Sequence, residues 1–469
     1  MSPLDSLTDL LGPDHCLRRE ADVAPYAVDW RGVYRGQPVA VLRPGRTEEV
    51  AAALRRCADL GLAVVPAGGR TSLCGAVVPL AQGPASVVLS LERMNRIRDL
   101  DARDMSLVAE AGCVVQSVQK AAEEAGRLFP LSFGAQGSAM IGGVIGTNAG
   151  GIRTIRYGNV RDLVLGLEVV LPDGRVLDDL RRVRKDNSGY ALRHLFIGAE
   201  GTLGVVTAAS LKLFPALRRR ETALVAIRDP DAALSLLNRC QESGADLVAF
   251  ELIRSVCIDI TLRHGSNVRK PMELTTEWVV LVEAASPHPA TPVRESLEAA
   301  LGEAIEAGEA LDVVLCESEA QRENLWTIRE TFPEASRHEA PGLPTDTAVP
   351  VSAVPEFLRR CGHLIATRYP RGKMVALGHM GDGNIHLSLQ APPGTPRPEW
   401  ETYGAGFEER VGEIAVELGG SFSAEHGIGQ SKLYGMAGLK SPVAVELMRA
   451  IKGVVDPEGR MNPGKVLPP

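Results

Sequence analysis

Short apolar runs alternate with amphipathic stretches along the first 215 residues. Runs such as PVAVLRP, LAVVPAG and LGLEVVLPDG are rich in β-branched residues, as strands are. Between such runs, residues 47–60 and 114–125 carry apolar side chains at helical spacing. Thr47 followed by two glutamates is typical of a capped helix start. The alternation predicts a domain of mixed helices and strands over residues 1–215.

A second pattern begins near residue 216. The order strand, helix, strand, strand, helix, strand is read from TALVAI, DAALSLLNRCQESG, LVAFELI, EWVVLVEA, PVRESLEAALGEAIEAG and LDVVLCES, and it is the order of a ferredoxin-like sandwich. A helix, two strands and two more helices are then predicted at residues 354–368, 374–377, 385–390, 400–418 and 442–453. We expect a second domain over residues 216–418 and a C-terminal segment over residues 419–469.

The composition indicates a multidomain protein that does not bind nucleic acid. With 469 residues, of which 45% are hydrophobic, the chain can bury more than one core. Its net charge of −7 gives no attraction for phosphate backbones, and the basic runs at 181–185 and 218–220 are typical of solvated loops. The eight cysteines never form C-x-x-C, so neither a zinc–thiolate site nor a disulfide framework is expected.

No targeting or membrane-spanning segment is recognisable. The first fifteen residues lack a basic region followed by an apolar stretch, and no run of about 18 apolar residues occurs. We therefore predict a cytoplasmic protein without a transmembrane segment.

Two glycine-rich segments are candidates for binding a ligand. PAGGRTSLCG, residues 66–75, directly follows a predicted strand, and GAQGSAMIGGVIGTNAGG, residues 134–151, holds seven glycines in 18 residues. Glycines let backbone N–H groups approach a diphosphate closely, although tight turns between strands also explain such residues. Neither segment fits the dinucleotide fingerprint or the P-loop, so a nucleotide bound by another backbone architecture is the hypothesis that follows.

GHMGDGNIH, residues 378–386, gathers two histidines around a turn-rich centre. A hairpin there could bring His379 and His386 together, and Glu425 and His426 in AEHGIG add a carboxylate and a third imidazole. Two histidines with one carboxylate suit Zn²⁺, Mn²⁺ or Fe²⁺ with a position left for substrate. By spacing alone, a pair of hydrogen-bonded structural histidines explains the pattern equally well.

Several motifs in order resemble one flavoprotein family. PAGGRTSLCG, the segment from PLSFGAQGSAM to LPDG, IGAEGTLGVVT and MNPGKV are similar to the FAD-binding segments of the vanillyl-alcohol-oxidase-type family. With GHMGDGNIH and AEHGIG added, the chain resembles its D-2-hydroxyacid dehydrogenase branch, which includes D-2-hydroxyglutarate and D-lactate dehydrogenases, over residues 36–467. The resemblance implies an α+β fold with an FAD-binding domain (1–215), a ferredoxin-like substrate-binding cap (216–418) and a helical C-terminal segment (419–469) that returns to the FAD domain.

The resemblance also implies which residues bind FAD. Backbone amides of residues 67–71 and 138–143 would hold the pyrophosphate, residues 200–206 would lie toward the adenine, and Asn462 would return to the isoalloxazine. The chain departs from its relatives at Arg70, Ser72 and Ala76, where Asn, Gly and Gly are common. The predicted cofactor-binding residues are Pro66, Ala67, Gly68, Gly69, Arg70, Thr71, Gly75, Gly137, Ser138, Ile141, Gly142, Gly143, Thr147, Asn148, Gly150, Gly151, Glu200, Gly201, Val206 and Asn462.

For the histidine-rich motifs, the resemblance implies that His379, His386 and Glu425 are metal ligands and that His426 is the catalytic base. Zn²⁺ is the first choice of metal, with Mn²⁺ and Fe²⁺ as alternatives. A metal on the substrate hydroxyl lowers its pKa, and a histidine can take the proton at neutral pH while Cα delivers hydride to flavin N5.

Arg329, in ENLWTIRE, matches a family arginine that pairs with the substrate carboxylate, a task suited to a guanidinium fork. Without the resemblance, an exposed helix arginine would be the ordinary interpretation. Asn384 and Lys432 are further substrate candidates, although a turn role and solvent exposure explain them as well. Pro333 and Pro344 replace a threonine and a lysine of hydroxyglutarate-specific relatives, so a second substrate carboxylate would lose two partners.

The predicted partners are a small 2-hydroxy acid and a separate electron acceptor, such as an electron-transfer flavoprotein, a quinone or a cytochrome. A homodimer is left open. One alternative is an oxidase of the same fold that uses O₂ and acts on a sugar or alcohol. Two alternatives from other classes are a zinc hydrolase, which would be colourless, and a non-catalytic flavin-binding subunit, which no hydroxy acid would reduce.

Overall fold

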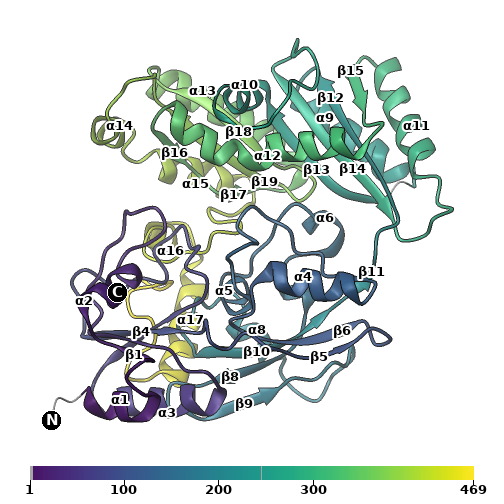
Figure 1. The fold of residues 1–469 in the computed structure, drawn as a ribbon. Helices are drawn as coiled ribbons and strands as arrows, with labels where there is room; N and C mark the ends of the chain where they lie inside the picture. The colour runs from purple at the N-terminus through teal and green to yellow at the C-terminus, as the bar shows by residue number, and fades with distance from the viewer. Residues whose placement is uncertain (1–3, 245, 469) are drawn as a thin grey trace. The chain divides into compact units, whose positions relative to one another are not determined.

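The computed structural model describes residues 4–244 and 246–468 (Figure 1). The chain forms two compact units. Unit 1 comprises residues 1–150, 157–216 and 425–469, and unit 2 comprises residues 151–156 and 217–424. Residues 151–156 and 419–424 therefore belong to unit 2, whereas the sequence predicts domain breaks after residues 215 and 418.

The strands of unit 1 are β1 (Cys16–Leu17), β2 (Ala40–Leu42), β3 (Ala63–Ala67), β4 (Ser86–Ser90), β5 (Ile97–Asp101), β6 (Ser106–Glu110), β7 (Arg127–Leu128), β8 (Val164–Val170), β9 (Val176–Asp179), β10 (Val205–Lys212) and β11 (Phe214–Pro215). They form a sheet of order β1-β2-β4-β3, in which β2, β4 and β3 are parallel, and an antiparallel sheet of order β5-β6-β10-β8-β9. Strand β11 pairs with β7. The parallel strands read as continuous apolar runs because both faces of that sheet are buried.

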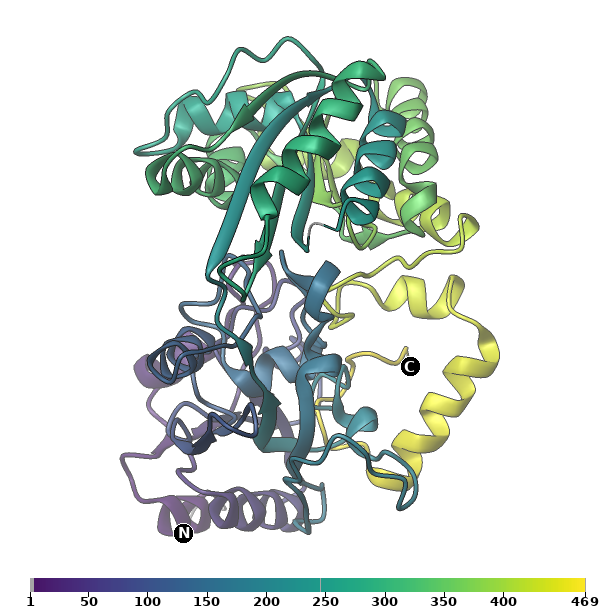
Figure 2. The ribbon, with the colours of Figure 1, turned by 90° about the vertical axis from the view of Figure 1, so that its right-hand side faces the viewer.

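The helices of unit 1 are α1 (Asp5–Leu11), α2 (Glu20–Val23), η1 (Ala24–Tyr26), α3 (Thr47–Asp59), α4 (Val115–Glu124), α5 (Ile141–Thr147), α7 (Val160–Leu163), α8 (Arg193–Phe196), α16 (Leu433–Gly438) and α17 (Pro442–Val455), and α6 (Thr154–Tyr157) crosses the boundary of the units. The yellow C-terminal segment in Figure 2 carries α16 and α17. Within unit 1 this segment reaches β3, where Met461 bridges Val64 in parallel. The last residues of the chain therefore lie beside the strand that leads into the first glycine-rich segment.

The strands of unit 2 are β12 (Arg219–Ile227), β13 (Leu247–Arg254), β14 (Trp278–Ser286), β15 (Ala310–Leu315), β16 (Gly342–Pro344), β17 (Thr347–Ala348), β18 (Lys373–His379) and β19 (Asn384–Gln390). They form one sheet of order β15-β12-β14-β13-β18-β19-β16, with β17 also paired to β19. Its first four strands have the 4-1-3-2 arrangement of a ferredoxin-like sandwich, and the sheet is extended at β13 by the hairpin β18–β19.

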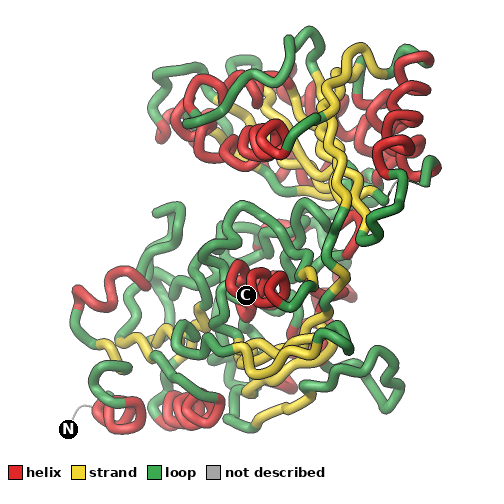
Figure 3. Tube along the Cα trace, turned by 45° about the vertical axis from the view of Figure 1, so that its right-hand side comes forward, coloured by secondary structure: helices red, strands yellow, loops and turns green. Residues whose placement is uncertain are grey.

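The helices of unit 2 are α9 (Pro230–Glu242), α10 (Ser255–His264), α11 (Val293–Glu306), α12 (Glu319–Glu339), η2 (Val351–Ala353), α13 (Val354–Arg368), α14 (Arg397–Tyr403) and α15 (Phe407–Glu417). Alternate residues of β12 enter two different cores. Ala223, Val225 and Ile227 pack with α9, α11 and α13, while Leu224 and Ala226 pack with α10 and α12. The sheet is thus covered by helices on both faces (Figure 3).

Three local predictions differ from the structure. Helix α10 is an addition to the predicted element order. The helix predicted over residues 400–418 is two helices, α14 and α15, because Gly406 takes a left-handed conformation between them. Thr47 is the first helical residue of α3 rather than its cap, and its hydroxyl donates to Glu168 instead. Among the described residues, no helix has the length and apolar composition needed to cross a membrane.

Candidate active site

The two glycine-rich segments meet within unit 1. The first, residues 66–75, leaves the end of β3, and the second leads through a turn into α5. A Cβ atom on Gly69 would lie 2.0 Å from the carbonyl oxygen of Ser138, a distance that no side chain allows. The two backbones therefore lie in direct contact, and glycine is required at this approach.

The predicted cofactor-binding residues lie in three segments of the chain and at Asn462. Pro66 and Ala67 end β3, residues 68–71 and Gly75 lie in the segment after it, and residues 137–150 form the turn, helix α5 and its end. Residues 200–206 lead into β10. Gly151 belongs to unit 2, whereas all the others are in unit 1.

The side chain of Arg70 turns toward η1. Its Nη1 donates to the carbonyl oxygen of Pro25, and its guanidinium carbon lies 4.4 Å from the centre of the Tyr26 ring. A hydrogen bond and a cation–π contact therefore hold the Arg70 side chain against η1. Only the backbone of Arg70 lies in the glycine-rich segment.

Asn462 joins the C-terminal segment to both the first glycine-rich segment and the residues before β10. Its Nδ2 donates to the carbonyl oxygens of Ala76, at 3.0 Å, and Glu200, at 2.7 Å. Its Oδ1 is buried and has no hydrogen-bond partner among the described residues. A buried acceptor without a partner costs about 1–3 kcal/mol, so a hydrogen-bond donor on a bound cofactor fits this position.

Glu200 holds the turn that follows His426. Its carboxylate accepts hydrogen bonds from the backbone N–H groups of Ile428, at 2.7 Å, and Gly429, at 2.9 Å. Burial raises the pKa of Glu200 to about 7, against these two hydrogen bonds and the positive charges of Lys432 and Lys465, which lower it. The Glu200 carboxylate therefore serves the AEHGIG turn, and the buried Lys432 contributes its charge to this cluster.

The same turn packs against the first glycine-rich segment. Cys74 Sγ lies 3.4 Å from the carbonyl oxygen of Gly427, and the Gln430 side chain donates to the carbonyl oxygen of Gly75 at 2.9 Å. A Cβ on Gly429, whose φ is +50°, would lie 2.0 Å from the carbonyl oxygen of Cys74. The turn after His426 thus depends on glycine at 429 for its close approach to the segment.

In unit 2, Arg329 and His379 share one buried carboxylate, that of Glu251. Glu251 on β13 and His379 on β18 are paired directly across the two strands. His379 Nδ1 lies 2.5 Å from Glu251 Oε1, and Arg329 Nε, from α12, donates to Glu251 Oε2 at 2.6 Å. All three side chains are buried, and Glu251 has no exposed surface.

Burial by itself would raise the pKa of Glu251. The charges of Arg329 and His379 and their hydrogen bonds outweigh burial and lower the pKa of Glu251 to about 2. The carboxylate is therefore ionised at neutral pH and accepts hydrogen bonds from both neighbours.

Asp346 organises a second set of polar groups in unit 2. Its carboxylate accepts hydrogen bonds from Asn384 Nδ2 at 3.2 Å and from the backbone N–H of Ala424 at 3.2 Å, and it lies 3.9 Å from His386 Nδ1. The ring centres of His379 and His386 are 5.4 Å apart. The hairpin β18–β19 therefore brings the two histidines of GHMGDGNIH side by side.

Four side chains could hold a metal ion. Asp346, His386, Glu425 and His426 each offer a ligand atom, and these atoms all lie within 4.8 Å of one another. Two imidazoles and two carboxylates suit Zn²⁺, Mn²⁺ or Fe²⁺. His379 is outside this group although it adjoins His386; because its Nδ1 faces Glu251, a metal would be held through its Nε2.

Sequence reasoning missed Glu251 and Asp346. A signal for Glu251 is present in LVAFELI, where a single charged residue interrupts an apolar strand; such a residue is buried only when it is paired. Asp346 has no comparable local signal. Its importance arises because β17, which follows it, pairs with β19 and aligns Ala348 with Asn384.

Solved structures of other proteins identify the fold. The chain is similar to p-cresol methylhydroxylase with substrate bound, with a TM-score of 0.74 and 16% identity, over 99% of this chain and 96% of that one. It is similar to 4-ethylphenol oxidase from Gulosibacter chungangensis, with a TM-score of 0.74 and 18% identity, over 99% and 97% of the two chains. The fold is that of the vanillyl-alcohol-oxidase-type flavoproteins, which confirms the predicted α+β class.

The chain belongs to the family of FAD-linked oxidases. Residues 216–466 match the family described as "FAD linked oxidases, C-terminal domain", and residues 38–179 match "FAD binding domain". FAD is therefore the cofactor, and the protein is an FAD-linked oxidoreductase, as the sequence resemblance predicts.

Curated relatives indicate the branch of the family to which the chain is similar. The chain is 37% identical over 470 residues to "D-2-hydroxyglutarate dehydrogenase" of Stutzerimonas stutzeri (strain A1501), covering 99% of this chain and 98% of the relative. It is 36% identical to the mitochondrial "D-2-hydroxyglutarate dehydrogenase" of Arabidopsis thaliana, over 98% and 80% of the two chains, and 37% identical to that of Bos taurus, over 97% and 82%. The predicted resemblance to this branch is confirmed, while the roles of individual residues stay predictions.

Proposed function

We propose that the protein oxidises a D-2-hydroxy acid to the corresponding 2-oxo acid, with FAD, a divalent metal ion and His426 as base. One observation carries the proposal. Asp346, His386, Glu425 and His426 gather potential ligand atoms within 4.8 Å, in a chain that is 37% identical along nearly its whole length to a D-2-hydroxyglutarate dehydrogenase. Imidazole and carboxylate donors of this kind suit a metal that polarises a hydroxyl group.

The proposed metal ligands are His379, His386 and Glu425. His386 and Glu425 belong to the cluster of potential ligand atoms, and His379 would bind through Nε2. When bound, the metal supplies a Lewis acid and a template for the substrate hydroxyl, with Zn²⁺ as the first choice and Mn²⁺ and Fe²⁺ as alternatives. Asp346 orients Asn384 through the hydrogen bond to its Nδ2, which directs the amide for a role in substrate binding.

FAD, when bound, supplies the acceptor for the two electrons that leave the substrate with its Cα hydrogen. The glycine-rich segments would offer backbone N–H groups to the pyrophosphate, and Asn462 would accept a hydrogen bond through its otherwise unpaired Oδ1. His426 would take the hydroxyl proton, a step suited to an imidazole whose unperturbed pKa is about 6.5.

Arg329 is proposed to bind the substrate carboxylate. Only its Nε is used by Glu251, which leaves the two Nη groups to form the fork that suits a carboxylate. Pro333 lies inside α12, and Pro344 ends β16; neither offers a donor to a second carboxylate. Candidate substrates are acids of the D-2-hydroxyglutarate, D-lactate and D-malate types. For an acid with a second carboxylate, Lys432 is the proposed substitute partner.

The proposed function also includes an electron acceptor and a cellular location, and it has one alternative. A separate electron acceptor, a cytoplasmic location and an open question of dimerisation stay as the sequence predicts them. The alternative is an oxidase of the same fold that uses O₂ to oxidise a sugar or alcohol. The solved structures that are 16% and 18% identical share the fold with this chain, but they support no role for a particular residue.

An anaerobic spectrum tests the proposal. We expect the purified protein to show a flavin band that D-2-hydroxyglutarate, D-lactate or D-malate bleaches, that the L-acids leave unchanged, and that a chelator protects. Bleaching would rank the substrates in the same experiment. A yellow protein that none of these acids reduces would favour the oxidase or a non-catalytic subunit.

The base is tested by His426→Ala. We expect FAD and metal to stay bound while flavin reduction slows by about 10²-fold, the usual scale for loss of a general base. Loss of the metal together with activity would instead make His426 a ligand, and unchanged reduction would reject both roles.

A further inference from the structure

Glu251 connects two residues that the proposed function treats separately. Arg329 lies 78 residues from Glu251 in sequence and His379 lies 128 residues away. The Glu251 carboxylate nevertheless contacts both, with one oxygen each, in the interior of unit 2. A fully buried carboxylate that is divided between a metal-ligand candidate and a substrate-binding candidate differs from an ordinary ion pair.

We infer that Glu251 is a positioning residue that holds His379 for the metal with one carboxylate oxygen and Arg329 for the substrate carboxylate with the other. The inference rests on the proposed function. It deepens that function, because it makes metal binding and substrate binding depend on a single side chain that touches neither ligand.

The geometry determines the tautomer of His379. One oxygen of Glu251 accepts from Arg329 Nε, and a carboxylate bound in this way also accepts through its other oxygen, so the Nδ1 atom of His379 that lies 2.5 Å from Oε1 carries the proton. The lone pair of the neutral ring is then on Nε2, the atom that a metal requires. Carboxylates that accept from a ligating histidine in this way also fix the ring orientation and increase its basicity as a ligand.

The geometry also determines which part of Arg329 is available. Glu251 takes the Nε–H group at 2.6 Å, and the Arg329 side chain forms no other hydrogen bond or ion pair within residues 4–244 and 246–468. Its four Nη hydrogens are thus left for a ligand. The guanidinium plane is set by the bond to Glu251, so the Nη fork meets a carboxylate without first having to be ordered.

Glutamine at position 251 cannot serve both neighbours. If its oxygen accepts from Arg329, its NH₂ group faces His379 and moves the ring proton to Nε2, where the metal should bind. If the amide is flipped, its NH₂ group faces the Nε–H of Arg329, and two donors oppose each other. Glu251→Gln therefore impairs one of the two sites in either orientation while it keeps the size of the side chain.

Glu283 provides a matched control in the same sheet. It lies on β14 and is buried, and its carboxylate accepts from Trp326 Nε1 at 2.9 Å and from the Thr222 hydroxyl at 3.0 Å. Trp326 belongs to α12, three residues before Arg329. Glu283→Gln therefore changes a buried carboxylate under the same helix without touching His379 or Arg329.

The test measures metal affinity by competition with a chelator and KM for the hydroxy acid at saturating metal, on the FAD-loaded full chain. We expect Glu251→Gln to weaken Zn²⁺ binding by about 10- to 100-fold, the range found for such supporting carboxylates, or to raise KM, depending on the amide orientation. Glu251→Asp, which keeps the charge, should recover part of the loss. Glu283→Gln should keep the wild-type metal affinity and KM, even where its Tm falls.

The outcomes separate this role from the proposed function. Wild-type metal affinity and KM in Glu251→Gln, or equal losses in Glu283→Gln, would overturn the role of Glu251 alone. A wild-type chain that binds no Zn²⁺ and whose flavin no hydroxy acid reduces would overturn the proposed function and this role with it. Should Glu251→Gln not fold, Glu251→Met/Arg329→Met, which buries no unpaired charge and leaves His379 Nδ1 without its acceptor, provides the measurement of metal affinity, with Arg329→Met as its reference.

Discussion

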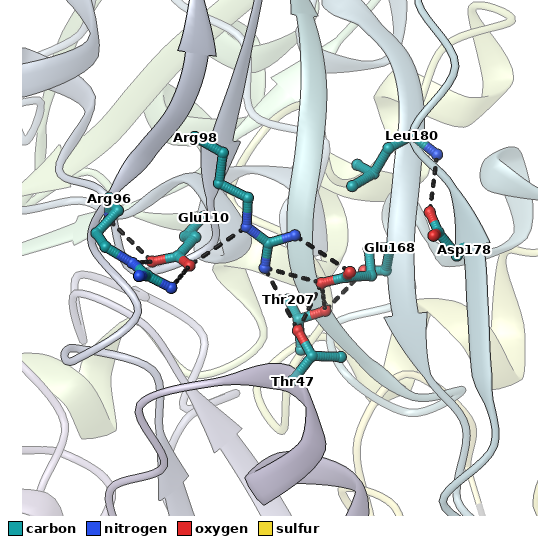
Figure 4. Close-up of polar contacts among 8 residues, drawn as sticks. All are labelled: Thr47, Arg96, Arg98, Glu110, Glu168, Asp178, Leu180 and Thr207. Carbon is teal, nitrogen blue, oxygen red and sulfur yellow. Dashed lines mark hydrogen bonds and ion pairs between the residues drawn. The ribbon is translucent and has the colours of Figure 1, made fainter.

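Each unit of the protein contains a network in which arginine is paired with buried glutamate, and the two networks differ in the arginine N–H groups that they leave without a partner. In unit 1, Arg98 lies between Glu110 and Glu168 (Figure 4). In unit 2, Glu251 lies between Arg329 and His379. The first has one cation between two anions, and the second has one anion between two donors.

The network of unit 1 is closed. Every side-chain nitrogen of Arg98 is engaged, Nε with Glu110 at 3.3 Å and Nη1 and Nη2 with Glu168 at 3.1 and 3.0 Å. Thr47 and Thr207 donate their hydroxyls to Glu168 as well, and Arg96 pairs with Glu110 (Figure 4). Each of the three side-chain nitrogens of Arg98 thus has a carboxylate partner, which distinguishes Arg98 from Arg329.

The acidity of the two glutamates follows from these partners. Burial opposes ionisation of Glu110 and Glu168. The hydrogen bonds of Arg96 and Arg98 nevertheless hold the pKa of Glu110 below the usual 4.5, and those of Arg98, Thr47 and Thr207 do the same for Glu168. The network therefore contributes to stability at neutral pH, and this contribution is lost as the pH falls below about 4.5.

The network of unit 2 is open, because the two Nη groups of Arg329 form no hydrogen bond or ion pair among the described residues. The difference teaches that a buried ion pair does not by itself indicate function. The indication comes from donors and ligand atoms that remain after the pair has formed. By this criterion the Arg98 network stabilises the sheet of unit 1, and the Glu251 network prepares side chains for chemistry.

Arg98→Met should have the largest effect, and on stability alone. The substitution leaves Glu168 and Glu110 buried with too few positive partners, which costs about 3 kcal/mol. We expect a lower Tm, while KM and kcat per folded, FAD-loaded molecule stay at wild-type values. A changed KM in this variant would contradict the division between a closed and an open network.

His379→Ala should affect metal binding. Loss of a ligand should weaken Zn²⁺ affinity by about 10²-fold, the equivalent of about 2.7 kcal/mol, and activity should fall with metal content. His363→Ala, at an exposed position on α13, is the matched control and should keep both. Full metal occupancy in His379→Ala under chelator competition would show that His379 is no ligand.

Arg329→Met should affect substrate binding. Removing charge-assisted hydrogen bonds to a carboxylate should lower kcat/KM by about 30-fold, or about 2 kcal/mol. Arg322, seven residues earlier on α12, donates to Thr222 and to the carbonyl oxygen of Arg220. Arg322→Met is therefore the control for the loss of a hydrogen-bonded arginine from the same helix, and an equal kinetic loss in both variants would remove Arg329 from the substrate site.

The smallest effect concerns Glu200, whose pKa is raised from its usual 4.5 to about 7 by burial. The stability that protonated Glu200 contributes is present below pH 4.5 and is lost as the pH rises through 7. Between about pH 6 and pH 8, the free energy of unfolding should fall by about 1 kcal/mol for this reason. We expect the Tm advantage of the wild type over Glu200→Gln to shrink over this interval. A constant difference would mean that Glu200 is already ionised at pH 6.

Local patterns in the sequence specify most elements of the fold. The helix predicted over residues 354–368 is α13 with the same bounds, and the strands predicted around GHMGDGNIH are β18 and β19. These elements are predictable because apolar spacing and turn residues act over a few neighbouring positions. The break at Gly406 and the helix α10 were not predicted, since tertiary packing decides such short elements.

The sequence by itself determined the motifs: two glycine-rich segments, the paired histidines 379 and 386, and the AEHGIG turn, all visible as residue types at short spacing. Only the tertiary structure decided that Glu251 stands across from His379, that Asp346 enters the cluster with His386, and that Glu200 holds the turn after His426. The physical reason is that a buried carboxylate is paired through strand register and packing between residues 38 to 228 positions apart. No local pattern records those distances.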